Sequence, residues 1–288
     1  MKLGGGLVEQ RRERVGYVHK MIRKKRYTRP KRTAAPVPMS LQRLFLACQD
    51  VFKRPPGSIP SPDDVQKLCH ILDGMVPEDV GLSRELQFFK PESPAKGTPR
   101  VTYTNIYSCK NFSLCIFFLP ATAVIPLHNH PGMTVFSKLL LGTMHIKAYD
   151  WADPKTSDDS LPFSQPRLAR LKADCVFQAP CDTKVLYPTS GGNMHAFTAI
   201  TPCAVLDVLG PPYSKEDGRD CSYYREIPYA ALSDGETRAT EEDSDSYGWL
   251  EEIETPKDSE MDGIEYLGPP VVETSPPASQ YKSYDLQS

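Results

Sequence analysis

The spacing of hydrophobic residues changes near residue 100 and separates a helical segment from a strand-rich one. Over residues 40–90, apolar residues recur every three or four positions, as they do on one face of a helix. We expect one helix over residues 40–53 with Ser40 as its N-cap, and a second that begins after Ser61 with a proline at its first position. A third, short helix is expected from Pro77. We predict that these helices pack on the outside of the main body.

Short runs rich in β-branched and aromatic residues follow from residue 100 onwards, and Gly, Pro, Asn and Asp turns separate them. About eight closely spaced strands without helices between them favour a sandwich or a barrel. We therefore predict a mainly β fold with its barrel over residues 100–230, interrupted by a polar loop at residues 152–166. The expected strands are Val101–Tyr107, Phe112–Leu119, Thr134–Leu141, His145–Trp151, Leu168–Phe177, Lys184–Tyr187, His195–Ile200 and Ala204–Leu209.

The two ends of the chain carry opposite charges, although the formal net charge is only −2. Residues 1–32 hold twelve Lys and Arg against two Glu, whereas residues 233–288 hold fifteen Asp and Glu against three basic residues. Because neither end has enough apolar residues for a core, we predict a disordered basic arm (1–36) and a disordered acidic tail (233–288). The folded domain between them is expected to span residues 37–232.

The basic arm favours nuclear localisation or loose electrostatic contact with nucleic acid or an acidic membrane. No reading helix accompanies its charges, so we do not expect nucleic acid as a partner. We expect the protein in the nucleus and the cytoplasm.

Eight cysteines are scattered along the chain without any CxxC pair. No secretory hydrophobic region follows Met1, and the longest apolar runs are too short to span a bilayer. This predicts an intracellular, soluble protein without disulfides or a membrane partner. We place Cys109, Cys115, Cys175 and Cys203 in the core and Cys181 in a turn.

Three histidines carry the most specific chemical signal. His128 and His130 are two positions apart, so on a strand they point to the same face. His195 follows a Pro-x-x-Gly-Gly turn and can complete a metal site of three nitrogens. Neutral imidazoles suit Fe, Zn, Cu and Ni. We expect His145, which begins a strand after a glycine turn, to be structural.

The stretch from Pro126 to Gly142 (PLHNHPGMTVFSKLLLG), together with the PTSGGNMH stretch that ends at His195, resembles the two metal motifs of the cupin superfamily. Many cupins carry a glutamate four or five residues after the second histidine, where this chain has Thr134 and Val135. The three-histidine pattern without an acid is typical of thiol dioxygenases. The segments DVLGPPY (207–213) and DCSYYREIP (220–228) extend the likeness to the plant cysteine oxidases, relatives of aminoethanethiol dioxygenase, over residues 40–230.

This resemblance implies a jelly-roll barrel (the double-stranded β-helix of cupins) and an activity. Members of that family use Fe(II) and O2 to oxidise the N-terminal cysteine of a protein to cysteine sulfinic acid. The arginine branch of the N-degron pathway reads the product, and the substrates include group VII ethylene-response transcription factors. The resemblance thus implies an oxygen sensor, which we expect to be a monomer. The lack of an obvious arginine to hold a free carboxylate also favours a peptide over a free amino acid.

The resemblance also assigns three residues beside the metal, and each has a structural alternative. Asp207 is expected to hold the substrate's ammonium group or to orient a ligand histidine; the alternative is an aspartate that caps a turn. Tyr213 is expected at the pocket mouth or as a donor to a bound oxygen species, with core packing as the alternative. Cys221 is expected near the active site, with a buried thiol at the barrel rim as the alternative.

Three other functions stay open from the sequence. The first is a cupin that acts as a binding or scaffold module through its charged ends. The second is a dioxygenase of a small thiol such as cysteamine. The third is a zinc isomerase or hydrolase, which would not add two oxygen atoms from O2 to its substrate.

Overall fold

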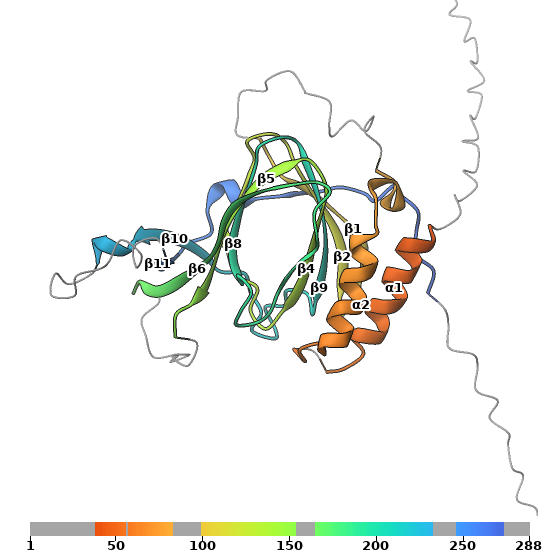
Figure 1. The fold of residues 1–288 in the computed structure, drawn as a ribbon, viewed down its shortest axis with the longest axis horizontal. Helices are drawn as coiled ribbons and strands as arrows, with labels where there is room; N and C mark the ends of the chain where they lie inside the picture. The colour runs from red at the N-terminus through yellow and green to blue at the C-terminus, as the bar shows by residue number, and fades with distance from the viewer. Residues whose placement is uncertain (1–37, 56, 83–98, 154–164, 233–245, 274–288) are drawn as a thin grey trace, which may run out of the picture. The chain divides into compact units, whose positions relative to one another are not determined.

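The computed structural model describes residues 38–55, 57–82, 99–153, 165–232 and 246–273 (Figure 1). The predicted basic arm and most of the loop expected at residues 152–166 lie outside these described residues. No helix in the described part of the chain is long and apolar enough to cross a membrane.

The helices before residue 100 form where the apolar spacing indicated them. Helix α1 (Met39–Val51) starts at Met39 without a side-chain cap, so the prediction of Ser40 as N-cap is wrong. Helix α2 (Pro62–Asp73) is capped by the Ser61 side chain, as predicted. The third segment is a 3₁₀ turn, η1 (Pro77–Val80).

Strands dominate the rest of the described chain, which confirms the predicted mainly β class. The eight expected strands form within about two residues of their predicted ends. Strands near residues 225 and 250 and a short one at residue 262 were not expected, and the strand near residue 126 was expected only through the HxH motif. The strands are β1 (Thr102–Ser108), β2 (Ser113–Leu119), β3 (Val124–His128), β4 (Thr134–Leu141), β5 (Thr143–Trp151), β6 (Arg167–Gln178), β7 (Lys184–Leu186), β8 (Met194–Ala199), β9 (Cys203–Gly210), β10 (Tyr223–Pro228), β11 (Tyr247–Ile253) and β12 (Asp262–Gly263).

Two sheets face each other around the barrel interior (Figure 1). Within the described residues, one sheet has the strand order β12-β1-β2-β9-β4-β7, and the other closes on itself in the order β10-β11-β6-β5-β8-β3. All pairings are antiparallel except that of β1 with β12. This is the jelly-roll arrangement that the resemblance implied.

Strand β9 explains how an acidic residue comes to lie in the barrel interior. Every residue of β9 is buried because helices α1 and α2 cover the outer face of its sheet, whereas its other face lines the barrel. Leu206 and Val208 pack in the same cluster as the helices. Successive residues of a strand point to opposite faces. Asp207, between them, therefore points into the barrel.

The C-terminal segment differs most from the sequence-based expectation. The predicted disordered tail is wrong for residues 246–273, which pack against the barrel and extend the folded domain beyond residue 232. Strand β11 pairs with β10 and β6, and Leu250 is fully buried. Further on, the backbone of Val272 exchanges two hydrogen bonds with the Gln42 side chain. The high density of acids across the segment hid this strand: its buried residues, Gly248 and Leu250, are followed directly by Glu251 and Glu252.

Candidate metal centre

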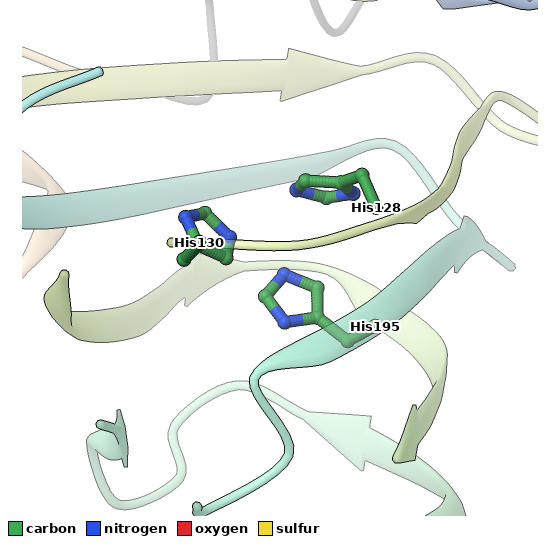
Figure 2. A group of neighbouring side chains, drawn as sticks. All are labelled: His128, His130 and His195. Carbon is green, nitrogen blue, oxygen red and sulfur yellow. The ribbon is translucent and has the colours of Figure 1, made fainter. Parts of the chain in front are cut away.

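The three predicted histidines come together from two neighbouring strands and the loop after one of them (Figure 2). His128 is the last residue of β3 and lies opposite His195 of β8 in the antiparallel ladder. His130 lies beyond the end of β3, so the expectation that both residues of the HxH motif are on a strand is wrong. The loop still turns its ring inward, and all three side chains are buried.

The three rings form a nearly regular triangle. Their centroids are 4.9 Å apart for His128 and His130, 4.8 Å for His128 and His195, and 5.0 Å for His130 and His195. One nitrogen from each ring lies within 4.8 Å of the others. Three nitrogens that bind one ion at about 2.1 Å lie closer together than this, so the rings would move inward when a metal binds.

Hydrogen bonds orient each ring by its Nδ1 atom. Nδ1 of His128 lies 2.8 Å from the carbonyl of Pro126, and Nδ1 of His195 lies 3.3 Å from the carbonyl of Gly192. Carbonyl oxygens only accept, so both Nδ1 atoms carry the proton and leave the Nε2 lone pair free. Nε2 of His130 is buried and has no hydrogen-bond partner among the described residues. An unpaired buried nitrogen beside two other lone pairs fits a metal ion.

Burial also keeps the three imidazoles neutral. It lowers the pKa of His128, and it lowers the pKa of His195 to about 3. The pKa of His130 falls well below its usual value because of burial and of the neighbouring His128 and His195. Neutral imidazole is the form that binds metals. Within the described part of the chain, this potential ligand group consists of three histidines and contains no carboxylate.

Tyr213 contacts the histidine group directly. Its hydroxyl lies 2.8 Å from the carbonyl of Asn129 and 2.8 Å from Nδ1 of His130. The hydroxyl therefore donates to the carbonyl and accepts from the Nδ1 proton, which directs Nε2 of His130 to the other two rings. This arrangement favours an orienting role over the predicted donation to a bound oxygen species.

Cys221 is partly buried beside the aromatic residues Tyr213 and Tyr223, and its thiol donates a hydrogen bond to the carbonyl of Ser222 at 3.9 Å. Burial raises the pKa of this thiol. At neutral pH the side chain is therefore a thiol and a hydrogen-bond donor rather than a nucleophilic thiolate. Its catalytic role stays a prediction.

Asp207 lies in the barrel interior with only 5% of its surface exposed, which excludes the alternative of a turn cap. Burial raises the pKa of its carboxyl group to about 7, and a hydrogen bond from Ser137 opposes that effect. Its Oδ1 atom has no hydrogen-bond partner among the described residues. An unpaired buried carboxylate oxygen is suited to receive a cationic group of a ligand.

A single cavity of about 410 Å³ joins these residues. The three histidines, Asp207, Tyr213 and Cys221 all line it.

His145 lies away from this cavity, as expected: its ring pairs with Asp174 on the outer part of the sheet. Of the cysteines placed in the core by sequence, Cys175 is exposed instead.

Two further residues of the cavity wall, Ser259 and Met261, come from the C-terminal segment. Sequence reasoning missed them because it treated this segment as disordered. The apolar residues Trp249 and Leu250 among the acids were the available signal that the chain folds back there.

Comparison with known proteins agrees with the geometry. The family model PCO_ADO matches residues 71–271. The chain is 51% identical over 239 residues to plant cysteine oxidase 1 of Arabidopsis thaliana, covering 81% of this chain and 80% of that protein. It is also 32% identical over 224 residues to 2-aminoethanethiol dioxygenase of Mus musculus, covering 73% and 86%.

Among solved structures, an RmlC-like cupin from Desulfovibrio desulfuricans matches with 19% identity and a TM-score of 0.27, covering 46% of this chain and 97% of that one. The family model and the relatives confirm the family expected from the motifs. The chain belongs to the PCO_ADO family, and it is an enzyme of the dioxygenase type.

Proposed function

We propose that this enzyme uses Fe(II) and O2 to oxidise the N-terminal cysteine of target proteins to cysteine sulfinic acid. The observation that carries the proposal is the buried group of three neutral imidazoles without a carboxylate. His128, His130 and His195 would hold the iron through their Nε2 atoms. A bound Fe(II) supplies the one-electron chemistry that allows O2 to react with a thiolate.

The absence of an acid from the ligand group supports a thiol substrate. Three neutral ligands would leave the full positive charge of a bound metal in a buried site, which would favour an anionic substrate group. A thiol would meet this requirement, since a metal favours its thiolate form. In the overall reaction, a thiolate and O2 give a sulfinate, so both oxygen atoms end on sulfur and no external reductant is needed.

Asp207 would hold the α-ammonium group of the same cysteine. Its unpaired Oδ1 atom lines the cavity that the histidines share, and an ammonium donor would satisfy it. The bound ammonium would also favour the ionised carboxylate, whose pKa is otherwise raised to about 7. This pairing requires a free amine next to the thiol, as an N-terminal cysteine has.

The similarity to the plant relatives supports a biological role as an oxygen sensor. We propose that the sulfinic product enters the arginine branch of the N-degron pathway, with group VII ethylene-response transcription factors as substrates. Sulfinic acid is not reversed by simple reductants, which suits a degradation signal.

The direct test is mass spectrometry of a peptide that begins with cysteine, incubated with the iron-loaded protein and O2. We expect a gain of about 32 Da on the cysteine, as two oxygen atoms add to sulfur. An N-acetylated copy of the peptide is the matched control and should stay unmodified. No oxidation of the free-amine peptide would refute the proposal. Oxidation of cysteamine in preference to the peptide would favour the small-thiol alternative, which the mammalian relatives support.

We further propose that the basic arm directs part of the protein to the nucleus. Its twelve basic residues within positions 1–32 are the basis for this proposal. Deletion of residues 1–32 should move a fluorescent fusion out of the nucleus without changing peptide oxidation. Unchanged localisation would refute this role.

A further inference from the structure

A buried carboxylate outside the cavity holds the turn that leads to His195. Asp150, near the end of β5, is only 8% exposed. Its Oδ2 atom accepts a hydrogen bond from the backbone N–H of Gly191 at 3.0 Å. Its Oδ1 atom accepts from the N–H groups of Gly192 at 2.9 Å and Asn193 at 3.0 Å. Three consecutive backbone N–H groups thus converge on one side chain, as they do around a bound anion.

Only glycine fits the first two positions of this turn. Gly191 and Gly192 have φ angles of +83° and +81°, in the left-handed region. A Cβ atom at Gly192 would lie 2.8 Å from Cβ of Ala148, and one at Gly191 would lie 2.8 Å from the carbonyl of Val185. The Gly-Gly pair therefore allows both the left-handed backbone and the close packing of the turn against Val185 and Ala148.

The same turn contacts two of the three histidines. The carbonyl of Gly192 accepts a hydrogen bond from Nδ1 of His195 at 3.3 Å. Oδ1 of Asn193 accepts from the backbone N–H of His130 at 3.0 Å, and Nδ2 of Asn193 donates to the carbonyl of His130 at 2.9 Å. Nδ2 also donates to the carbonyl of Tyr187 at 2.8 Å, so the buried side-chain amide of Asn193 makes three hydrogen bonds. Asn193 therefore fixes the backbone of His130 relative to the turn before His195.

We propose that Asp150 is a positioning residue of the metal centre, which sets metal affinity through the turn of residues 191–193 and the Asn193 side chain. The inference rests on the proposed metal function of the three histidines. Asp150 does not line their cavity. Asp150 acts through its hydrogen bonds to the turn of residues 191–193, and this turn orients both the His195 ring and the His130 backbone. Groups that orient metal ligands commonly change metal affinity by about 10- to 100-fold when they are removed.

Two substitutions of Asp150 should weaken metal binding to different degrees. Asp150→Ala removes all three hydrogen bonds and should weaken metal binding by about 10- to 100-fold. Asp150→Asn can keep an acceptor oxygen for Gly192 and Asn193 while it loses the bond from Gly191, so a smaller loss of affinity is expected. The matched control is Asp73→Asn. Asp73 also accepts from a loop backbone N–H, that of Thr183 at 2.7 Å, but it contacts none of the turn residues.

The experiment titrates each metal-free full-length variant with Co(II) and follows visible absorption, with urea unfolding measured with and without the metal. The metal-induced rise in unfolding free energy reports affinity even for a destabilised variant. We expect Asp150→Ala to lose the most Co(II) affinity, Asp150→Asn to lose less, and Asp73→Asn to keep wild-type affinity.

Loss of stability with wild-type affinity in both Asp150 variants would overturn the inference and leave the proposed function standing. No Co(II) or Fe(II) binding by the wild-type chain would refute the proposed metal centre itself. Should Asp150→Ala not fold, wild-type affinity of Asp150→Asn would overturn the inference.

Discussion

The buried carboxyl group of Asp207 should make the stability of the metal-free protein depend on pH, and Asp207→Asn should remove that dependence. The pKa of the group is raised to about 7 from 3.8, mainly by burial. The folded state therefore holds its proton to a higher pH than the unfolded state does. Stability from this group is fully present below the unfolded pKa and is lost as the pH rises through about 7. Asparagine is close in shape to the protonated acid and does not titrate.

The size of the effect follows from the pKa difference. The shift of about three units corresponds to about 4 kcal/mol once the group is ionised in both states, at about 1.4 kcal/mol per unit. Part of this loss occurs below about pH 5, where the unfolded state already ionises. Between about pH 5 and about pH 8, wild type should lose about 2.5 kcal/mol of stability relative to Asp207→Asn.

Urea unfolding of both metal-free proteins across this pH range measures the difference. Asp73→Asn is the control because hydrogen bonds from Thr183 and attraction to Lys138 outweigh burial and lower the pKa of Asp73. Asp73 is thus ionised in both states over the whole range, and its substitution should shift stability by a constant amount. Parallel stability curves for wild type and Asp207→Asn would refute the assignment of a costly buried carboxylate. The same variant should bind iron nearly as wild type does yet oxidise a cysteine peptide poorly, and full activity would exclude Asp207 from substrate binding.

Two further substitutions test other parts of the site. His195→Ala should lose iron and activity together while the fold, checked by circular dichroism, stays intact; normal turnover would show that the ligand assignment is wrong. Met261→Ala should raise KM for a cysteine peptide about fivefold at unchanged iron affinity, as expected for about 1 kcal/mol of lost apolar contact in the cavity wall. An unchanged KM would show that the C-terminal segment does not contact the substrate.

Local patterns in the sequence predicted most of the strands and the group of three histidines. Short runs rich in β-branched and aromatic residues between turns predicted eight strands, and the HxH motif with a later histidine after a Gly-Gly turn predicted three side chains that the structure brings together. Asp207 could be placed inside the barrel only when the structure showed that helices α1 and α2 bury the other face of β9. Before that, a turn cap stayed open as an alternative for an acid near a Gly-Pro-Pro corner.

Long-range pairing explains what the sequence did not reveal. Strand β11 pairs with β6, more than seventy residues earlier in the chain, and no local signal specifies that partner. The hydrogen bonds from three backbone N–H groups to Asp150 could not be predicted either, because every residue except proline has a backbone N–H and the sequence does not show which ones face a given carboxylate. The cavity wall from Ser259 and Met261 was missed for a different reason: the high charge of the C-terminal segment outweighed its few apolar residues and predicted disorder.

Isotope labelling tests the central claim most directly. The iron-loaded protein would be mixed with a cysteine-initiated peptide under ¹⁸O₂ in ordinary water, with the His195→Ala variant in parallel. We predict that both heavy oxygen atoms appear on the N-terminal sulfur with wild type and neither with the variant. Label absent from the product, oxygen derived from water, or equal labelling by His195→Ala would contradict thiol dioxygenation at a centre of three histidines.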